Sequence, residues 1–183
     1  TAVNESLQRG LAAAESIFQL IDETPEPSGV AVLPARPAGR LRFEGVCFGY
    51  QDREVLAEIN LDIAAGESVA FVGPSGGGKT SLVNLVPRFY SPQRGRVLLD
   101  DQPIDALDLR SLRAAIAYVG QHVVLFNDTV RNNIAYGALR EAPQARVREA
   151  ADAAHVTEFV EALPNGFETE IGDNGLRLSG GQR

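Results

Sequence analysis

The sequence predicts an α/β domain that is preceded by a separate helix and a proline-rich linker. From Leu41 onward, strand-sized apolar runs alternate with helical patterns, which is typical of a sheet covered by helices. One run, Ser68–Val72, is nearly continuous in apolar residues, as a buried parallel strand would be. A glycine-rich loop follows it directly and leads into a helical pattern from about Gly78 to Arg88. The 183 residues suffice for one such domain and a short appendage.

The first 22 residues predict a single amphipathic helix. Apolar residues recur at steps of four and three and form a stripe made of Leu7, Leu11, Ala14, Phe18 and Ile21. Polar residues fall on the other side of this helix. The stripe is typical of packing against a partner helix or a domain surface, although the cytoplasmic end of a membrane helix can also have this pattern.

Residues 23–40 contain four prolines and two glycines. Proline removes amide donors and fixes the backbone, so the segment predicts a linker rather than a regular element. We therefore expect a domain boundary here. Beyond it, further strands are expected at 41–48, 59–63, 96–100 and 116–119, further helices at 109–115, 130–136, 143–154 and 156–163, and a loop at 164–178.

The glycine-rich loop has the spacing of a phosphate loop, with Gly73, four residues, and then Gly78, Lys79 and Thr80. Glycines let successive amide N–H groups turn inward and form an anion-binding concavity, to which the first helical turn adds unpaired amides. Lys79 would reach the β- and γ-phosphates, and the Thr80 hydroxyl would be a ligand of Mg²⁺. The pattern predicts a nucleoside triphosphate site but leaves kinases, GTPases, helicases and transport ATPases open.

Composition narrows the possible partners. The net charge of −7 argues against a nucleic-acid surface, which needs an excess of lysine and arginine. No apolar run reaches the roughly 18 residues that span a bilayer, and no secretory signal is present. The single cysteine, Cys47, lies in an apolar stretch, and we expect it to be a small buried hydrophobe in a protein from a reducing compartment.

The last residues separate the possible classes. Leu178-Ser179-Gly180-Gly181-Gln182 resembles the signature of ATP-binding cassette proteins. With this motif the whole chain resembles the nucleotide-binding domain of an exporter whose membrane and nucleotide domains share one subunit, most of all the bacterial lipid A exporter type. The resemblance implies the fold of the phosphate-loop NTPases, with a RecA-like core, an antiparallel β subdomain and a helical subdomain at about 122–183, incomplete at the C-terminus.

The resemblance also implies roles for individual residues. Tyr50 is similar to the aromatic residue that stacks on adenine, and Gln121 is similar to the glutamine that reaches Mg²⁺ or the attacking water. Gln121 and Lys79 are thus the catalytic residues expected in this chain, with Thr80 and Gln121 at the metal. The expected nucleotide-binding residues are Tyr50, Gly73, Pro74, Ser75, Gly76, Gly77, Gly78, Lys79, Thr80, Ser81, Ser179, Gly180, Gly181 and Gln182.

Other segments resemble the exporter cassette more closely than other cassettes. Residues 125–137 are similar to its helical subdomain, where Asp128 or Thr129 would cap a helix. Residues 170–175 are similar to the segment that touches the membrane domain, but Asn174 stands where arginine or lysine is frequent, so the charge contact of that position is not carried over. At the turn after residues 96–100, Asp101 stands where glycine is usual, and we expect a left-handed backbone there at some strain.

By the resemblance, two cassettes pair head to tail, most simply as a homodimer, with ATP and Mg²⁺ between one phosphate loop and the partner's signature. Pairing would act on the transmembrane domain of the same polypeptide at the cytoplasmic face of the membrane. Residues 1–22 would be the cytoplasmic end of the last transmembrane helix, and their function would be mechanical coupling.

The acidic residues that hold Mg²⁺ and activate water follow the signature in this family, and none of them can be assigned here. His122, His155 and Glu170 are poor substitutes, and His155 is expected at the surface. We therefore expect no ATPase activity from these 183 residues alone, poor stability and exposed core edges. Two alternatives stay open: a non-transport cassette of DNA repair or translation, and a regulatory cassette that binds ATP without hydrolysis.

Overall fold

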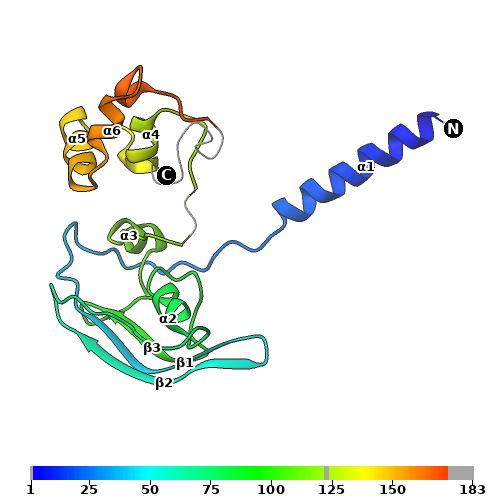
Figure 1. Cartoon of the computed structure of the whole chain (residues 1–183). Coiled ribbons are helices and arrows are strands. Elements are labelled where there is room, and N and C mark those ends of the chain that lie inside the picture. The colour runs from blue at the N-terminus through cyan, green and yellow to red at the C-terminus, as the bar shows by residue number, and fades with distance from the viewer. Residues whose placement is uncertain (1, 122–123, 173–183) are drawn as a thin grey trace. The chain divides into compact units, whose positions relative to one another are not determined.

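The computed structural model describes residues 2–121 and 124–172, and the chain divides into two compact units, residues 1–117 and 118–183 (Figure 1). The elements of the first unit are α1 (Ala2–Ile21), β1 (Leu41–Tyr50), β2 (Arg53–Ile63), α2 (Lys79–Leu85), β3 (Arg94–Leu99), β4 (Gln102–Pro103) and α3 (Leu109–Ala114). Those of the second are α4 (Val130–Ile134), η1 (Gly137–Leu139), α5 (Gln144–Ala153), α6 (Thr157–Glu161) and η2 (Gly166–Glu168).

The first unit is built on an antiparallel sheet with the strand order β2-β1-β3-β4. This arrangement confirms the antiparallel β subdomain. The hairpin between β3 and β4 turns at Asp100 and Asp101, whose φ angles of 49° and 65° are both left-handed. A turn with two such residues matches the twist of the flanking strands, and aspartate tolerates it better than most residues. The expectation of a left-handed backbone at Asp101 is therefore confirmed.

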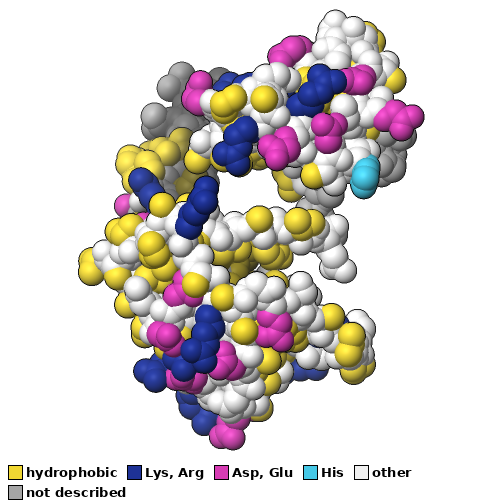
Figure 2. Space-filling view, turned by 90° about the vertical axis from the view of Figure 1, so that its left-hand side faces the viewer, with side chains coloured by type: hydrophobic (Ala, Val, Ile, Leu, Met, Phe, Trp, Pro, Cys, Tyr) yellow, Lys and Arg dark blue, Asp and Glu magenta, His cyan; other side chains and the backbone are white. Residues whose placement is uncertain are grey.

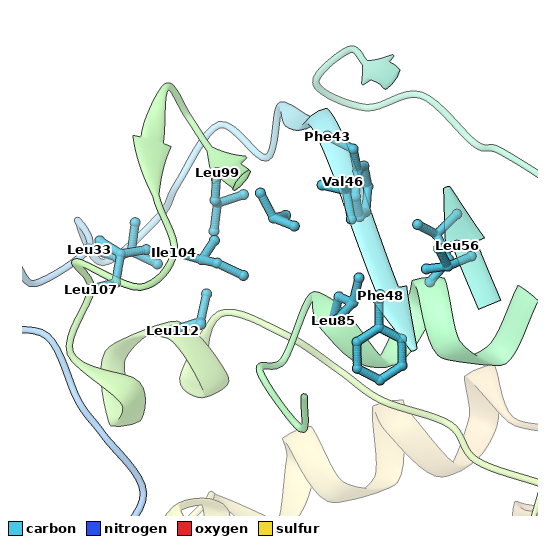
Figure 3. Packing of buried hydrophobic residues seen from close by; sticks show 12 residues of the cluster. Leu33, Phe43, Val46, Phe48, Leu56, Leu85, Leu99, Ile104, Leu107 and Leu112 are labelled. Atoms are coloured by element: carbon cyan, nitrogen blue, oxygen red, sulfur yellow. The ribbon is translucent and has the colours of Figure 1, made fainter. Parts of the chain in front are cut away.

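One face of the sheet packs against α2 and α3 (Figures 1 and 3). Phe43, Val46 and Phe48 of β1 are at most 4% exposed, and Leu85 of α2 and Leu112 of α3 are fully buried. Cys47 is buried as well, with its sulfur accepting the Glu58 backbone N–H at 3.2 Å, so it is the small buried residue that was expected. This core holds α2, and with it the end of the glycine loop, against the sheet.

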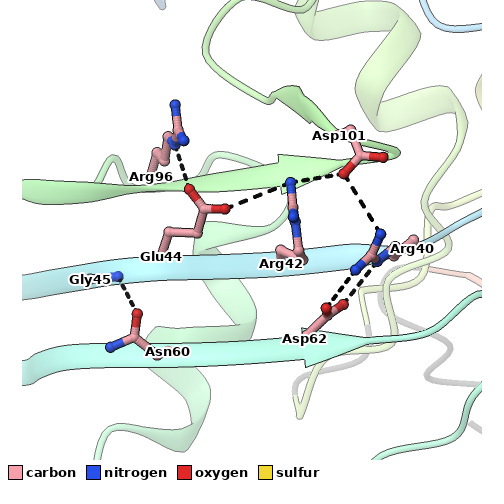
Figure 4. A network of polar contacts seen from close by, with 8 residues as sticks. All are labelled: Arg40, Arg42, Glu44, Gly45, Asn60, Asp62, Arg96 and Asp101. Atoms are coloured by element: carbon pink, nitrogen blue, oxygen red, sulfur yellow. Dashed lines mark hydrogen bonds and ion pairs between the residues drawn. The ribbon is translucent and has the colours of Figure 1, made fainter.

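The opposite face of the sheet is charged (Figure 4). Ion pairs link neighbouring strands: Arg40 binds Asp62 through two hydrogen bonds of 2.9 and 2.6 Å, and Arg42 lies 2.8 Å from Asp101. A third pair joins Glu44 to Arg96 at 2.6 Å. In the view of Figure 2, acidic and basic side chains of this unit lie interspersed. The sheet is thus amphipathic, which orients it with its apolar face toward the helices.

Two predicted strands do not form. Residues 68–72 and 116–119 carry no ladder pairing in the part of the chain that the structure describes. Val72 is 89% exposed and Val119 is 95% exposed, which contradicts the prediction of a buried parallel strand. The physical reason is that a strand exists through hydrogen bonds to a neighbour, and an apolar run without a partner remains irregular.

The proline-rich segment contains no helix or strand, in agreement with its composition, but it is bound to the first unit. We call residues 26–40 the strap. Its Ala31 forms an isolated bridge with Leu107, and its Leu33 is only 7% exposed within the main core. The division between the two compact units falls between residues 117 and 118, close to the start of the helical subdomain expected at about 122–183.

The second unit consists of short helices around its own core, in which Val130, Val160 and Phe167 are buried. Thr129 caps α4, since its side chain accepts the Asn132 backbone N–H at 3.1 Å. Asp128 supports the cap by accepting hydrogen bonds from the Asn132 side chain and the Thr129 N–H. These hydrogen bonds lower the pKa of its carboxyl group. The cap predicted for this position is therefore confirmed.

Helix α1 matches the predicted amphipathic helix, and the described part of its stripe is exposed, with Phe18 at 61% and Ile21 at 68%. Among the helices that the structure describes, none is both long and apolar enough to cross a membrane.

Candidate nucleotide-binding site

The glycine loop adopts a backbone that only glycine accommodates at its last position. Gly78 has a φ of 79° and is the N-cap of α2. A Cβ atom there would lie 2.7 Å from the Leu56 side chain and 3.1 Å from that of Val55. The turn into α2 therefore depends on both the left-handed angle and the close approach to β2, for which glycine is the residue that fits.

Helix α2 is anchored on one side and open on the other. Ser81, Leu82 and Leu85 are buried, whereas Thr80 is exposed. Its first turn closes with the hydrogen bond from Leu82 N–H to the Gly78 carbonyl at 2.8 Å. The Thr80 hydroxyl thus lies on the accessible side of the helix start, as a ligand of Mg²⁺ would have to.

Lys79 folds back over the loop. Its Nζ atom donates to the Gly73 carbonyl at 2.9 Å and to the Pro74 carbonyl at 2.7 Å. These contacts hold an ammonium group above the loop backbone, in which the Gly77 N–H donates to the Pro74 carbonyl at 3.2 Å. An ammonium at this position can exchange carbonyl partners for phosphate oxygens, so the residues present fit a polyphosphate bound with Mg²⁺.

Tyr50 ends β1 beside the start of α2. Its hydroxyl lies 3.1 Å from the Ser81 Oγ, and its side chain is 42% exposed. Two aromatic rings hold it edge-on: Phe48 at 4.9 Å and Tyr90 at 5.2 Å between ring centroids. The structure therefore brings Tyr50 into direct contact with the phosphate-loop helix.

Tyr90 was not among the residues predicted for the site. The pattern that could have indicated it is the aromatic pair Phe89-Tyr90, which comes shortly after the end of α2. Its edge-to-face contact with Tyr50 has the geometry that aromatic pairs prefer, and this contact restricts the orientation of the Tyr50 ring.

The other predicted residues lie in the second unit or outside the described residues. Gln121 is exposed and belongs to the second unit, whereas the loop belongs to the first. Asp173, Asn174 and the signature residues Ser179–Gln182 lie outside the described residues. His155 is exposed, as expected, and has a left-handed φ of 57° where α5 ends. Within residues 2–121 and 124–172, no group of three or more His, Cys, Asp or Glu side chains could hold a metal ion.

Comparison with known proteins identifies the family of this chain. The family model described as "ABC transporter" matches residues 56–183. The ATP-dependent lipid A-core flippases of Thiobacillus denitrificans and Chromobacterium violaceum are each 55% identical over all of this chain, which spans 32% of their length. The solved structure of a bacterial Atm1-family ABC exporter with ATP bound aligns with a TM-score of 0.82 and 44% identity over 98% of this chain and 32% of that one.

The fold and the loop define an ATP-binding domain of the phosphate-loop NTPase class, with an antiparallel β subdomain and a helical subdomain. Within that class, the chain belongs to the ABC transporter family. Its likeness to lipid A-core flippases and to an Atm1-family ABC exporter agrees with the resemblance that the signature motif indicated.

Proposed function

We propose that this chain supplies the ATP-binding residues of the motor domain of an exporter subunit that moves a lipid or another amphipathic compound across a membrane. The observation that carries the proposal is the phosphate loop, in which Lys79 lies over the glycine backbone at the start of a helix anchored in the core. The names of the relatives support the lipid class, since they are flippases of lipid A-core.

In this proposal the chain contributes one half of a shared site. The loop amides and Lys79 bind the phosphates, Thr80 and Gln121 are ligands of Mg²⁺, and Tyr50 stacks on the base. Ser179, Gly180, Gly181 and Gln182 contact the γ-phosphate of the other subunit in a head-to-tail pair. Mg²⁺ supplies charge neutralisation at the β- and γ-phosphates. The site would face the cytoplasm, next to the transmembrane domain of the same polypeptide.

Binding of ATP by the purified chain tests the site directly. Lys79→Ala should weaken the affinity for Mg-ATP by about 100-fold, because a charge-assisted contact to phosphate is lost. Tyr50→Ala should weaken the affinity for ATP by about 10-fold and leave that for inorganic tripolyphosphate unchanged, because stacking concerns only the base. Calorimetric titration measures both affinities. Tyr136→Ala removes another exposed tyrosine from the second unit and is the matched control.

A hybrid protein tests the proposed role in transport. Residues 41–183 of this chain would replace the corresponding segment of a lipid A-core flippase in cells that depend on it. Growth that is abolished by Lys79→Ala in the hybrid would support a motor function with lipid export. If the hybrid inserts in the membrane and binds ATP but never sustains growth, the lipid class is wrong for this chain.

A further inference from the structure

The strap is held to the first unit at both ends by hydrogen bonds of its backbone. Near its start, the Gly29 and Ala31 N–H groups donate to the Leu107 and Ala106 carbonyls at 3.0 Å each. At its far end, the Asp100 carboxylate accepts three consecutive N–H groups at 2.7, 2.9 and 2.8 Å, those of Ala38, Gly39 and Arg40. Such a segment moves with the unit rather than independently of it.

Arg113, which belongs to α3, joins the start of the strap to the residues that directly follow α2. Two of its guanidinium nitrogens donate to the two carboxylate oxygens of Glu26, each at 2.7 Å. The same group donates to the Pro87 carbonyl at 3.0 Å and to the Arg88 carbonyl at 3.3 Å. A planar fork of donors can serve a carboxylate on one edge and carbonyls on the other, which a lysine ammonium cannot do with the same geometry. The hydrogen bonds of Glu26 also raise the pKa of Arg113 further above its ordinary value.

Arg88 makes a second connection between the same segments. Its guanidinium donates to the Pro27 carbonyl of the strap at 2.9 Å. Its backbone has a left-handed φ of 55°, and its Nη1 atom is buried with no hydrogen-bond partner among the described residues. A strained backbone and an unsatisfied donor each cost free energy, so the surrounding contacts must hold this end of α2 in place.

The two ends of α2 are mechanically connected. The helix is only seven residues long, about 10 Å, and its buried side chains Ser81, Leu82 and Leu85 leave it no room to bend. Its N-terminal end is the phosphate loop with Lys79 and Thr80. Its C-terminal end is held by Arg113, whose positive charge also suits the carbonyl end of a helix. A displacement of the strap therefore shifts the phosphate loop through a short rigid helix.

We propose that Arg113 is a positioning residue that couples the strap to the phosphate loop, so that the attachment of the strap and the binding of a nucleotide influence each other. This inference rests on the proposed nucleotide site. Energetic coupling between two sites is reciprocal. A nucleotide at the loop must therefore tighten or loosen the strap, and breaking the Arg113 contacts must change nucleotide affinity by a corresponding factor.

Hydrogen exchange of the Gly29 and Ala31 amides, measured with and without Mg-ATP, shows how firmly the strap is attached. Calorimetry measures the affinity for Mg-ATP. In the unmodified chain, Mg-ATP should change the exchange rates of both amides. In Arg113→Gln the response should vanish, and the ATP affinity should change by about 5-fold. Arg96→Gln is the control: it removes another arginine–carboxylate ion pair, the one with Glu44, from the same unit without touching the strap or α2, and it should alter neither quantity.

The exchanged pair Glu26→Arg with Arg113→Glu separates attachment from coupling. It can restore the ion pair, but a glutamate at position 113 cannot donate to the Pro87 and Arg88 carbonyls. The exchange rates should return toward those of the unmodified chain while the response to ATP stays absent. Glu26→Gln weakens the link to the strap but leaves the hydrogen bonds from Arg113 to the Pro87 and Arg88 carbonyls in place, so it replaces Arg113→Gln in this comparison if that variant does not fold.

Coupling is refuted if Arg113→Gln, folded by circular dichroism, keeps both the ATP affinity and the ATP response of the strap amides. It is equally refuted if the unmodified chain binds ATP without any change in those amides. Failure of the nucleotide site is a different result: the unmodified chain would then bind no ATP, while the strap amides would still exchange slowly.

Discussion

The strap and residues 68–72 both lack regular secondary structure, but they differ in their backbone hydrogen bonds and in their burial. The strap is rich in proline and glycine, but it buries Leu33 and bonds its backbone at both ends. Residues 68–72 have the composition of a buried strand, but Val72 is 89% exposed and the segment pairs with no strand among the residues that the structure describes. The difference shows that hydrogen-bond partners, rather than residue propensity, decide which segments are fixed.

The largest difference between the two segments should appear on truncation of their apolar side chains. Leu33→Ala is expected to reduce the free energy of unfolding of the first unit by about 2–3 kcal/mol, because it leaves a cavity in the core. Val72→Ala should change it by less than about 0.5 kcal/mol, because that side chain already contacts solvent. Urea denaturation followed by circular dichroism measures both. Equal effects of the two substitutions would contradict the comparison.

A smaller effect is expected at the far end of the strap. Asp100→Ala removes the carboxylate that accepts the Ala38, Gly39 and Arg40 amides, and alanine is strained at a φ of 49°. We expect a loss of about 1–3 kcal/mol in stability, together with faster hydrogen exchange at these three amides. Asp100→Asn keeps one acceptor and tolerates the backbone, so it should lose less. Unchanged exchange in Asp100→Ala would show that other contacts fix this end.

Local patterns predicted much of this molecule. The spacing of Gly73, Gly78 and Lys79 located the phosphate loop because its chemistry lies within eight consecutive residues. Helix α2 and the cap at Thr129 were predicted for the same reason, whereas the antiparallel sheet was implied by the family resemblance. These features depend on neighbours in sequence, which a single chain displays directly.

Features that depend on distant residues were missed. The strap is fixed by partners far along the chain, such as Arg113, which lies 87 positions from Glu26, and composition alone made it a linker. The prediction of a strand at 68–72 was wrong because a strand forms only with a hydrogen-bonded neighbour. The residues of the segment itself do not show whether it has such a neighbour. The role of Tyr90 was missed because its contact with Tyr50 appears only when β1 and the end of α2 are brought together.

The smallest expected effect is a dependence of the strap on pH. The hydrogen bonds from Arg113 lower the pKa of Glu26 below its ordinary value of 4.5. Because the ionised form is favoured by folding, this contribution is fully present above pH 4.5 and is lost as the pH falls through the lower pKa of the folded chain. After correction for the intrinsic pH dependence of amide exchange, the exchange rates of Gly29 and Ala31 should therefore increase as the pH falls below 4.5.

Glu26→Gln cannot titrate at this position, so the acceleration should be absent in that variant over the same pH range. Asp62→Asn is the control, because the pKa of Asp62 is also lowered, by its hydrogen bonds with Arg40, on the charged face of the sheet. It should change the acid stability of the unit but leave the acid response of Gly29 and Ala31 intact. If Asp62→Asn abolished that response while Glu26→Gln preserved it, the start of the strap would be held by the sheet and not by Arg113.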